Sequence, residues 1–258
     1  MLHAVAKVNV VRPPVLDLAV TPLTDRPAIR AFLLSSLCNT VNPQFIIRNS
    51  TAIPLITSYI ASARSSSIKA ITSDPTLDCE NQHSIVCDNA VIRESLNGLV
   101  SSLLQALTGT FVPMADGAIS LRYYPPAATK AEDRTAQRLG AHVDGNFMTL
   151  LLSTRVGLQV PNPAENEGIT RSQVQNYGMP TLTGEILFFS DEKWSYVDQR
   201  EDEILVSLGN EFFEDKRVAF PEKATIFGPL LHRVNDGKMD GGDRISVPFL
   251  SFLATDGN

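Results

Sequence analysis

Two residues with metal-binding side chains, His142 and Asp144, lie two positions apart in the segment RLGAHVDGNF. On an extended chain, residues i and i+2 project from the same face, so an imidazole and a carboxylate at this spacing can bind one ion. A surface pair or a capping pair would have the same spacing. The motif therefore predicts half of a metal site, which needs a further ligand from elsewhere in the chain.

The candidate third ligand is His232, which ends the apolar run IFGPLLH. The chain contains only four histidines, so few combinations could form a histidine-rich site. The other two, His3 and His83, have no neighbours at metal-ligand spacing, and we assign them to the surface.

The segment RISVPF follows His232 and places Arg244 and Ser246 on one face of an expected strand. Arg-x-Ser is uninformative by itself, because the pattern also begins at Arg48, Arg64 and Arg93. The order of the motifs is more specific. A His-x-Asp, a distant His and then Arg-x-Ser all fall within the same half of the chain.

Helix-forming and strand-forming segments occupy different parts of the sequence. Apolar residues recur at helical spacing over 26–37, 52–64 and 88–108, with Asp88 as the expected N-cap of the last helix. From residue 111 onward, short β-rich runs alternate with turns: AISLRYY, FMTLLLS, GLQV, GEILFFS, ATIFGPLL and RISVPFLSFL. Helices followed by strands indicate a mainly β sandwich or barrel with an N-terminal helical layer, an α+β arrangement.

Composition narrows the class of protein. The 258 residues carry a formal charge of −6, without a basic block at either end, so we do not expect nucleic acid as a partner. The longest apolar stretches fall far short of the roughly 18 residues that a membrane helix needs, so we do not expect a membrane as a partner either. The three cysteines lack CxxC spacing, which argues against a disulfide framework or a structural zinc site. We expect a single cytoplasmic domain, and the sequence does not predict its oligomeric state.

The sequence resembles the isopenicillin N synthase-like family of Fe(II)- and 2-oxoglutarate-dependent dioxygenases, whose fold is the double-stranded β-helix, or jelly roll. LRYYPP, HVDGNFMTLLLS, GLQV, LHRV and RISVPF look like family segments and occur in the family's order. The early PPVLDLA segment is similar to the family's opening strand. The resemblance implies one domain over 1–258, with a mostly helical support over 1–110 and a jelly-roll core over 111–258.

The resemblance implies a role for each motif. His142, Asp144 and His232 would bind Fe(II) and act as the catalytic centre, while Tyr124, Arg244 and Ser246 would hold 2-oxoglutarate, with O2 as the other cosubstrate. Two imidazoles and one carboxylate leave three positions open on the metal, which is the arrangement of non-haem oxygenases. A guanidinium suits the distal carboxylate of the cosubstrate because it never deprotonates and donates two parallel hydrogen bonds.

The chain departs from the family at several positions. Arg122 stands where relatives commonly carry Asn. It would either pair with an internal carboxylate or bind a carboxylate of the substrate. Asn146, Phe147 and Leu250 are further candidates for the substrate pocket, although Phe147 and Leu250 could equally be core residues. The segment near 161–192 is expected to be a surface insertion.

Three functions remain open. The first is an oxygenase of specialised metabolism that hydroxylates, desaturates or oxidatively cyclises a small, carboxylate-bearing, amino-acid-like molecule. The second is an iron-dependent oxidase of the same fold that does not use 2-oxoglutarate. The third is a non-catalytic jelly-roll binding protein. Zinc-dependent hydrolysis would leave the Arg244 and Ser246 motif without a role.

Overall fold

The computed structural model describes residues 9–38, 40, 42–73, 83–126, 139–162, 193–235 and 242–254. The predicted strand GEILFFS and nearly all of the expected insertion near 161–192 lie outside these residues, as does His3. Within the described chain, no helix is long and apolar enough to cross a bilayer.

The larger of two sheets has seven described strands in the order β2-β3-β10-β7-β12-β5-β4, and all neighbours are antiparallel except β2 and β3. Its strands are β2 (Val15–Asp17), β3 (Gln44–Arg48), β4 (His83–Val86), β5 (Ala118–Tyr124), β7 (Met148–Ser153), β10 (Ile204–Leu208) and β12 (Arg244–Ser251). The smaller sheet has the order β1-β9-β8-β11-β6, with only β1 and β9 parallel. Its strands are β1 (Val10–Val11), β6 (Leu139–His142), β8 (Leu158–Pro161), β9 (Trp194–Val197) and β11 (His232–Val234).

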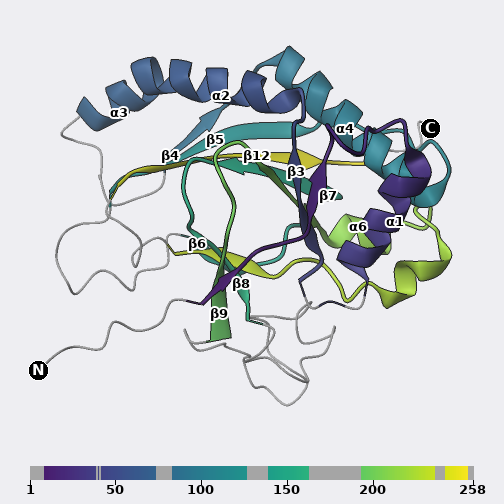
Figure 1. The fold of residues 1–258 in the computed structure, drawn as a ribbon. Helices are drawn as coiled ribbons and strands as arrows, with labels where there is room; N and C mark the ends of the chain where they lie inside the picture. Colours follow the sequence, from purple (N-terminus) through teal and green to yellow (C-terminus); the bar gives the residue numbers. More distant parts are fainter. Residues whose placement is uncertain are drawn as a thin grey trace, which may run out of the picture.

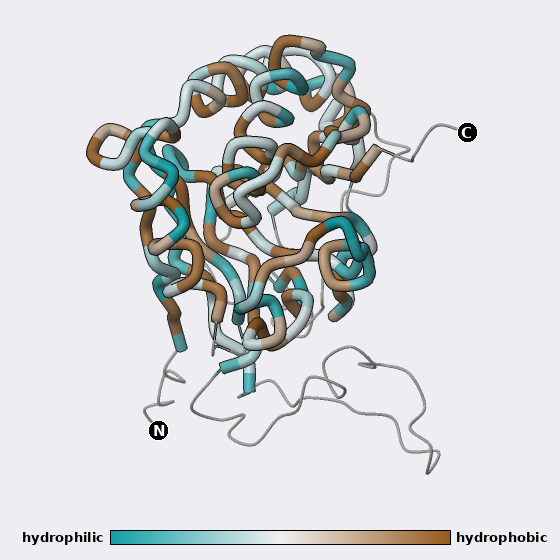
Figure 2. The backbone as a smooth tube through the Cα atoms, turned by 90° about the vertical axis from the view of Figure 1, so that its right-hand side faces the viewer, coloured by the Kyte–Doolittle hydropathy of each residue, from teal (hydrophilic) through white to brown (hydrophobic). Residues whose placement is uncertain are grey.

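Three long helices cover the outer face of the larger sheet (Figure 1). They are α1 (Arg26–Leu37), α2 (Ala52–Ala63) and α4 (Ala90–Thr108). Apolar and polar residues alternate along them in Figure 2, as expected of helices with one buried face. The shorter helices are η1 (Arg64–Ile68), α3 (Lys69–Ser73), α6 (Asn210–Glu214) and η3 (Pro221–Thr225).

The helix ends follow local chemistry. Asp25 caps α1 by accepting a hydrogen bond from the Ala28 amide at 3.2 Å. Gly109 ends α4 with a φ of 78°, in the left-handed region that favours glycine. The N-cap predicted for α4 is wrong by one residue, because Asn89 accepts from the Ile92 amide at 3.1 Å, while Asp88 accepts from Arg93.

The protein has two main apolar layers, one between the helices and the larger sheet and one between the two sheets. The larger core lies between the helices and the outer face of the seven-stranded sheet, and it includes Leu121, Tyr123 and Phe249. A second cluster lies between the two sheets and includes Tyr124 and Leu158. Residues therefore alternate along β5 between the helix side and the space between the sheets, as period-2 geometry requires.

Two facing, mostly antiparallel sheets with a helical layer on one side form a double-stranded β-helix, so the predicted fold class is confirmed. The N-terminal region is not purely helical, however. β3 lies inside the larger sheet, and β2 forms within the PPVLDLA segment. The predicted strand ATIFGPLL is wrong as a continuous strand, because η3 enters it and β11 begins only at His232.

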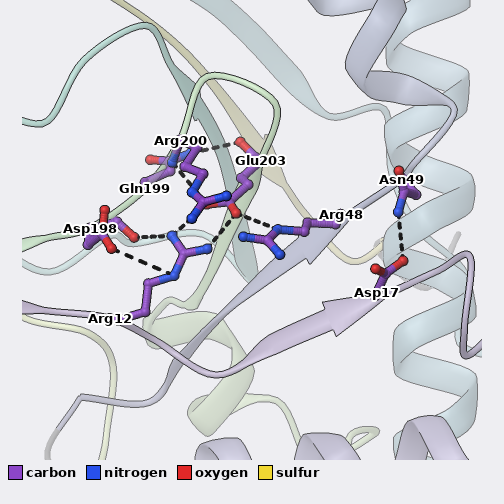
Figure 3. Close-up of polar contacts among 8 residues, drawn as sticks. All are labelled: Arg12, Asp17, Arg48, Asn49, Asp198, Gln199, Arg200 and Glu203. Carbon is purple, nitrogen blue, oxygen red and sulfur yellow. Dashed lines mark hydrogen bonds and ion pairs between the residues drawn. The ribbon is translucent and has the colours of Figure 1, made fainter.

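A buried carboxylate links the N-terminal segment to the larger sheet (Figure 3). The Glu203 side chain is 0% exposed and accepts hydrogen bonds from Arg12 and from Arg48 Nε, the latter at 2.6 Å. The Arg200 amide donates a further bond at 2.9 Å. Burial alone would raise the pKa of Glu203, but these bonds outweigh it and lower the pKa to about 2.

We predict that Glu203→Gln lowers the free energy of unfolding at neutral pH. The loss should lie at the lower end of the roughly 3–5 kcal/mol that follows when a buried ion pair is broken, because both arginines are partly exposed. Because folding lowers this pKa, the contribution is complete above about pH 4.5 and is lost as the pH falls towards 2.

Urea unfolding across this pH range tests the prediction. Asp198→Asn is the matched control, because Asp198 is 47% exposed and its carboxylate lies 3.8 Å from Arg12 Nε. It should change stability by less than about 1 kcal/mol. Equal losses in the two variants would contradict the assigned role of Glu203.

Candidate metal centre

The two candidate histidines lie directly opposite each other on neighbouring strands. β6 and β11 are antiparallel, and His142 pairs with His232 in the register. The next pair is Leu139 with Val234, so β6 uses one more residue than β11 between the two pairs. This β-bulge lets Leu139 and His142 face the same side of the sheet, although three positions separate them.

The third candidate, Asp144, lies in the loop that follows β6. Its Oδ1 atom is 3.6 Å from His142 Nε2 and 3.8 Å from His232 Nε2. One ligand atom from each of the three residues lies within 4.8 Å of the other two. The structure therefore brings the three predicted ligands together, as the spacing and order of the motifs suggested.

Each ligand is oriented by a second contact on its other polar atom. His142 Nδ1 lies 2.8 Å from the Gly140 carbonyl oxygen, and His232 Nδ1 lies 3.1 Å from that of Leu230. A carbonyl can only accept, so each Nδ1 donates, and in the neutral form of each imidazole Nε2 then carries the lone pair that can bind an ion. Thr149 Oγ1 donates to Asp144 Oδ2 at 2.6 Å, which leaves Oδ1 directed at the histidines.

The charges of the cluster are coupled. Burial raises the pKa of Asp144, but the hydrogen bond from His142, the charge of His232 and the bond from Thr149 outweigh it and hold this pKa well below its usual range. Burial also acts to lower the pKa of His142, yet the bonds to Asp144 and Gly140 raise it overall. The pKa of His232 is lowered, mainly by burial.

Arg122 lies close enough to these histidines for its positive charge to lower the pKa of both. It is on β5, where it pairs with Ser84 of β4 on one side and Ser246 of β12 on the other. In the parts of the chain that the structure describes, no acidic side chain forms an ion pair with it. The described residues therefore give no support to the first interpretation of Arg122, an ion pair with an internal carboxylate.

Arg122 is only partly buried, whereas another cationic side chain, that of Arg244, is fully buried between the sheets. Arg244 is 1% exposed and pairs with Tyr124 across β12 and β5, with its guanidinium carbon 5.0 Å from the Tyr124 ring centroid. Tyr124 belongs to the same apolar cluster as Leu230 and Val234, the residues that flank the His232 position. Ser246 follows two residues after Arg244 on the same face and is 2% exposed.

The absence of a side chain at Gly157 leaves the space that the Arg244 side chain occupies. A Cβ atom on Gly157 would lie 2.8 Å from Arg244 Cδ and 2.9 Å from Nε. The Nε atom donates to the Arg155 carbonyl at 3.2 Å, so the guanidinium is held from two sides. The sequence identified Gly157 only as part of the GLQV segment, and its contact with Arg244 is a non-local feature.

The remaining predicted pocket residues divide into three cases. Leu250 pairs with Thr149 on β7 and is partly buried, so it lies on the face that carries the Asp144 contact. Asn146 is 3% exposed and its amide is bonded to Thr149 at 3.2 Å, which makes it part of the ligand loop. Phe147 follows the core alternative, because its ring is 0% exposed and packs 5.2 Å from that of Phe212 in the helix-side core.

Sequence reasoning missed Thr149, although a signal was present. In FMTLLLS it is the polar residue that interrupts an apolar run, and period-2 counting places it on the face opposite Met148 and Leu150. His83 is partly buried beside Tyr123, with ring centroids 6.5 Å apart, rather than fully at the surface.

The fold of this chain has counterparts among solved structures. A full-length Neurospora crassa protein, solved in complex with α-ketoglutarate (2-oxoglutarate), aligns with a TM-score of 0.58 and 13% identity over 95% of this chain and 86% of that one. Dioxygenase for auxin oxidation 1 from Arabidopsis thaliana (AtDAO1), solved with 2-oxoglutarate, gives 0.56 and 13% over 95% and 94%.

JOX2, solved with 2-oxoglutarate, Fe and JA, aligns with a TM-score of 0.52 and 15% identity over 98% of this chain and 78% of that one. The sequence matches no protein-family model and no curated protein. At these identities the likeness establishes that the chain shares its fold with these proteins.

We predict that metal binding weakens as the pH is lowered through the pKa of His142. An imidazole must be neutral to bind a metal, and the pKa of His142 is raised above 6.5, so protons compete with the ion already above that pH. His232, with its lowered pKa, should compete only at lower pH.

Titration of the metal-free protein by NMR, with Zn(II) affinity measured in parallel, tests this order. The imidazole of His142 should titrate above 6.5 and that of His232 below it. A Zn(II) affinity that does not change between about pH 6 and pH 8 would contradict the prediction.

Proposed function

We propose that the chain is an Fe(II)- and 2-oxoglutarate-dependent oxygenase of the isopenicillin N synthase-like kind. In this proposal it hydroxylates, desaturates or oxidatively cyclises a small, carboxylate-bearing, amino-acid-like molecule in specialised metabolism. The observation that carries the proposal is the cluster of His142, Asp144 and His232, in which the ligand atoms lie within 4.8 Å of one another and a second contact holds each side chain.

The donor set fits Fe(II). Two neutral imidazoles and one carboxylate suit a borderline divalent ion and leave coordination positions open, as in non-haem iron oxygenases. With 2-oxoglutarate bound beside it, the iron would supply the activation of O2 and the oxidation of the substrate. The protein's task is to hold the three ligands in place, position the target bond and exclude water.

Charge balance assigns Arg244 to the cosubstrate. Fe(II) and the Asp144 carboxylate sum to +1, and the 2-oxoglutarate dianion would make the centre −1. A buried guanidinium restores neutrality and offers two parallel hydrogen bonds to the distal carboxylate. Ser246 and Tyr124, which share its face and its strand pair, complete the proposed clamp. The structures of the Neurospora crassa protein, AtDAO1 and JOX2, which contain 2-oxoglutarate, support this proposal.

The position and charge of Arg122 support the proposal that the substrate carries a carboxylate. A cation close to the metal ligands, with no ion-pair partner among the described residues, favours an anionic group on the bound molecule. We propose that it binds the substrate carboxylate, with Leu250 beside Thr149 as part of the same pocket.

We predict that the protein, loaded with Fe(II) under anaerobic conditions, develops a visible iron-to-ketoacid charge-transfer band when 2-oxoglutarate is added. Arg244→Gln should raise the 2-oxoglutarate concentration for half-maximal absorbance by about tenfold or more, because a charge-assisted hydrogen-bonded pair is lost. Gly157→Ala should act in the same direction, because its methyl group displaces the Arg244 side chain.

Arg64→Gln is the control for these variants, because Arg64 is a half-exposed residue that pairs with Asp243. Iron content should be the same in all four proteins. A protein that binds iron but shows no band would favour the oxidase that does not use 2-oxoglutarate. A protein that binds no iron would favour the non-catalytic binding protein.

We predict that Arg122 selects acids over neutral analogues. Release of succinate from 2-oxoglutarate should be stimulated by members of a panel of free amino acids and not by their methyl esters. Arg122→Gln should abolish the preference and Arg122→Lys should keep part of it, because the lysine retains the charge but not the planar fork. Stimulation by the esters equal to that by the acids would contradict this role.

A further inference from the structure

The loop that carries Asp144 rests on the junction between β10 and α6, which we define as residues 208–211. The Asn210 amide donates to the Asp144 carbonyl at 2.8 Å, and the Gly209 amide donates to the Phe147 carbonyl at 3.1 Å. The Glu211 amide donates to the Asn146 carbonyl at 3.3 Å. Three consecutive amides thus fix the backbone of the ligand loop.

The same junction also reaches the segment before His232. The Leu230 amide donates to the Leu208 carbonyl at 3.1 Å, and the Leu230 carbonyl is the group that orients His232 Nδ1. Two ligands that are 88 residues apart in sequence therefore depend on one short stretch of backbone. All of these contacts use backbone atoms of the junction.

Gly209 leaves no room for a side chain at this contact. A Cβ atom there would lie 2.1 Å from the Asn146 carbonyl oxygen and 2.9 Å from that of Asp144. Both are backbone atoms, which cannot rotate away as a flexible side chain could. The Gly209 backbone is extended, with φ of −100°, so the requirement for glycine is one of space and not of backbone conformation.

The junction itself is firmly packed. If a side chain were added at Gly209, the loop of Asp144 would therefore have to move rather than the junction. β10 is inside the larger sheet, where Leu208 pairs with Met148, and Phe212 of α6 is 0% exposed against Phe147. Gly145, in the loop, is exposed, and a Cβ atom there would have nothing within 4 Å.

We propose that Gly209 is a positioning residue of the metal centre, whose missing side chain lets the loop of Asp144 dock close enough for three ligands to share one ion. The inference rests on the proposed metal site. It goes beyond that site by assigning part of the metal affinity to a residue that contacts no ligand side chain.

Gly209→Ala tests the proposal, with Gly145→Ala as the matched control in the same loop. The readouts are the affinity of each metal-free protein for Co(II), the visible spectrum of the Co(II) complex, and the unfolding temperature without metal. Gly209→Ala should weaken Co(II) binding by about tenfold or more and change the spectrum, as is typical when groups that orient metal ligands are altered. Gly145→Ala should match the unsubstituted protein.

A folded Gly209→Ala protein with unchanged affinity and spectrum would overturn the inference and leave the proposed function intact. If the unsubstituted protein binds neither Co(II) nor Fe(II), the proposed function fails, and the inference fails with it. A Gly209→Ala protein that is less stable without metal, but has the unchanged Co(II) affinity and spectrum, would assign the glycine a purely structural role and also overturn the inference.

Hydrogen exchange in the unsubstituted protein tests the same coupling without any variant, so it decides the matter if Gly209→Ala does not fold. Because energetic coupling between two sites is reciprocal, Zn(II) binding should slow exchange of the Asn210 and Glu211 amides. The Ile92 amide, which is bonded to Asn89 at the start of α4, is the control and should not change. Equal exchange at Asn210 with and without Zn(II) would overturn the proposal.

Discussion

The pairing register of β6 and β11 is the constraint on which the candidate site depends. It sets His142 opposite His232, and directly opposed residues of an antiparallel pair project to the same face of the sheet. A shift by one residue would move one imidazole to the other face of the sheet and remove the site. Asp144 then needs only a short loop to reach the two Nε2 atoms.

Around this histidine pair, the fold buries polar and charged groups, although burying them does not by itself stabilise an apolar core. Thr149 and two backbone carbonyls hold the ligands, and Arg244 is buried between the sheets in a space that Gly157 leaves open. Burying a guanidinium is costly, and well-packed apolar residues often stabilise a fold at least as well. We therefore attribute this arrangement to the proposed binding of a dicarboxylate near a metal rather than to stability of the fold.

The sequence predicted the parts of this site that follow from local spacing. His142 and Asp144 needed only period-2 geometry, and the helix over 26–37 begins and ends where its apolar spacing and Pro27 place it. β3 and β10 were missed because their residues are almost all buried, so they show no alternation of apolar and polar residues. The contact of Gly209 with the ligand loop joins distant segments through backbone atoms, and such a contact requires no particular residue type that a sequence could show. For Phe147 the sequence left a pocket role and a core role open, and the structure places its ring in the helix-side core.

The most direct test of the account is the iron content of the protein after anaerobic loading and removal of excess metal. The unsubstituted chain should retain one Fe(II), and His142→Ala, Asp144→Ala and His232→Ala should each retain little or none while remaining folded. Full iron content in any one of the three folded variants would contradict the claim that these residues form one metal centre.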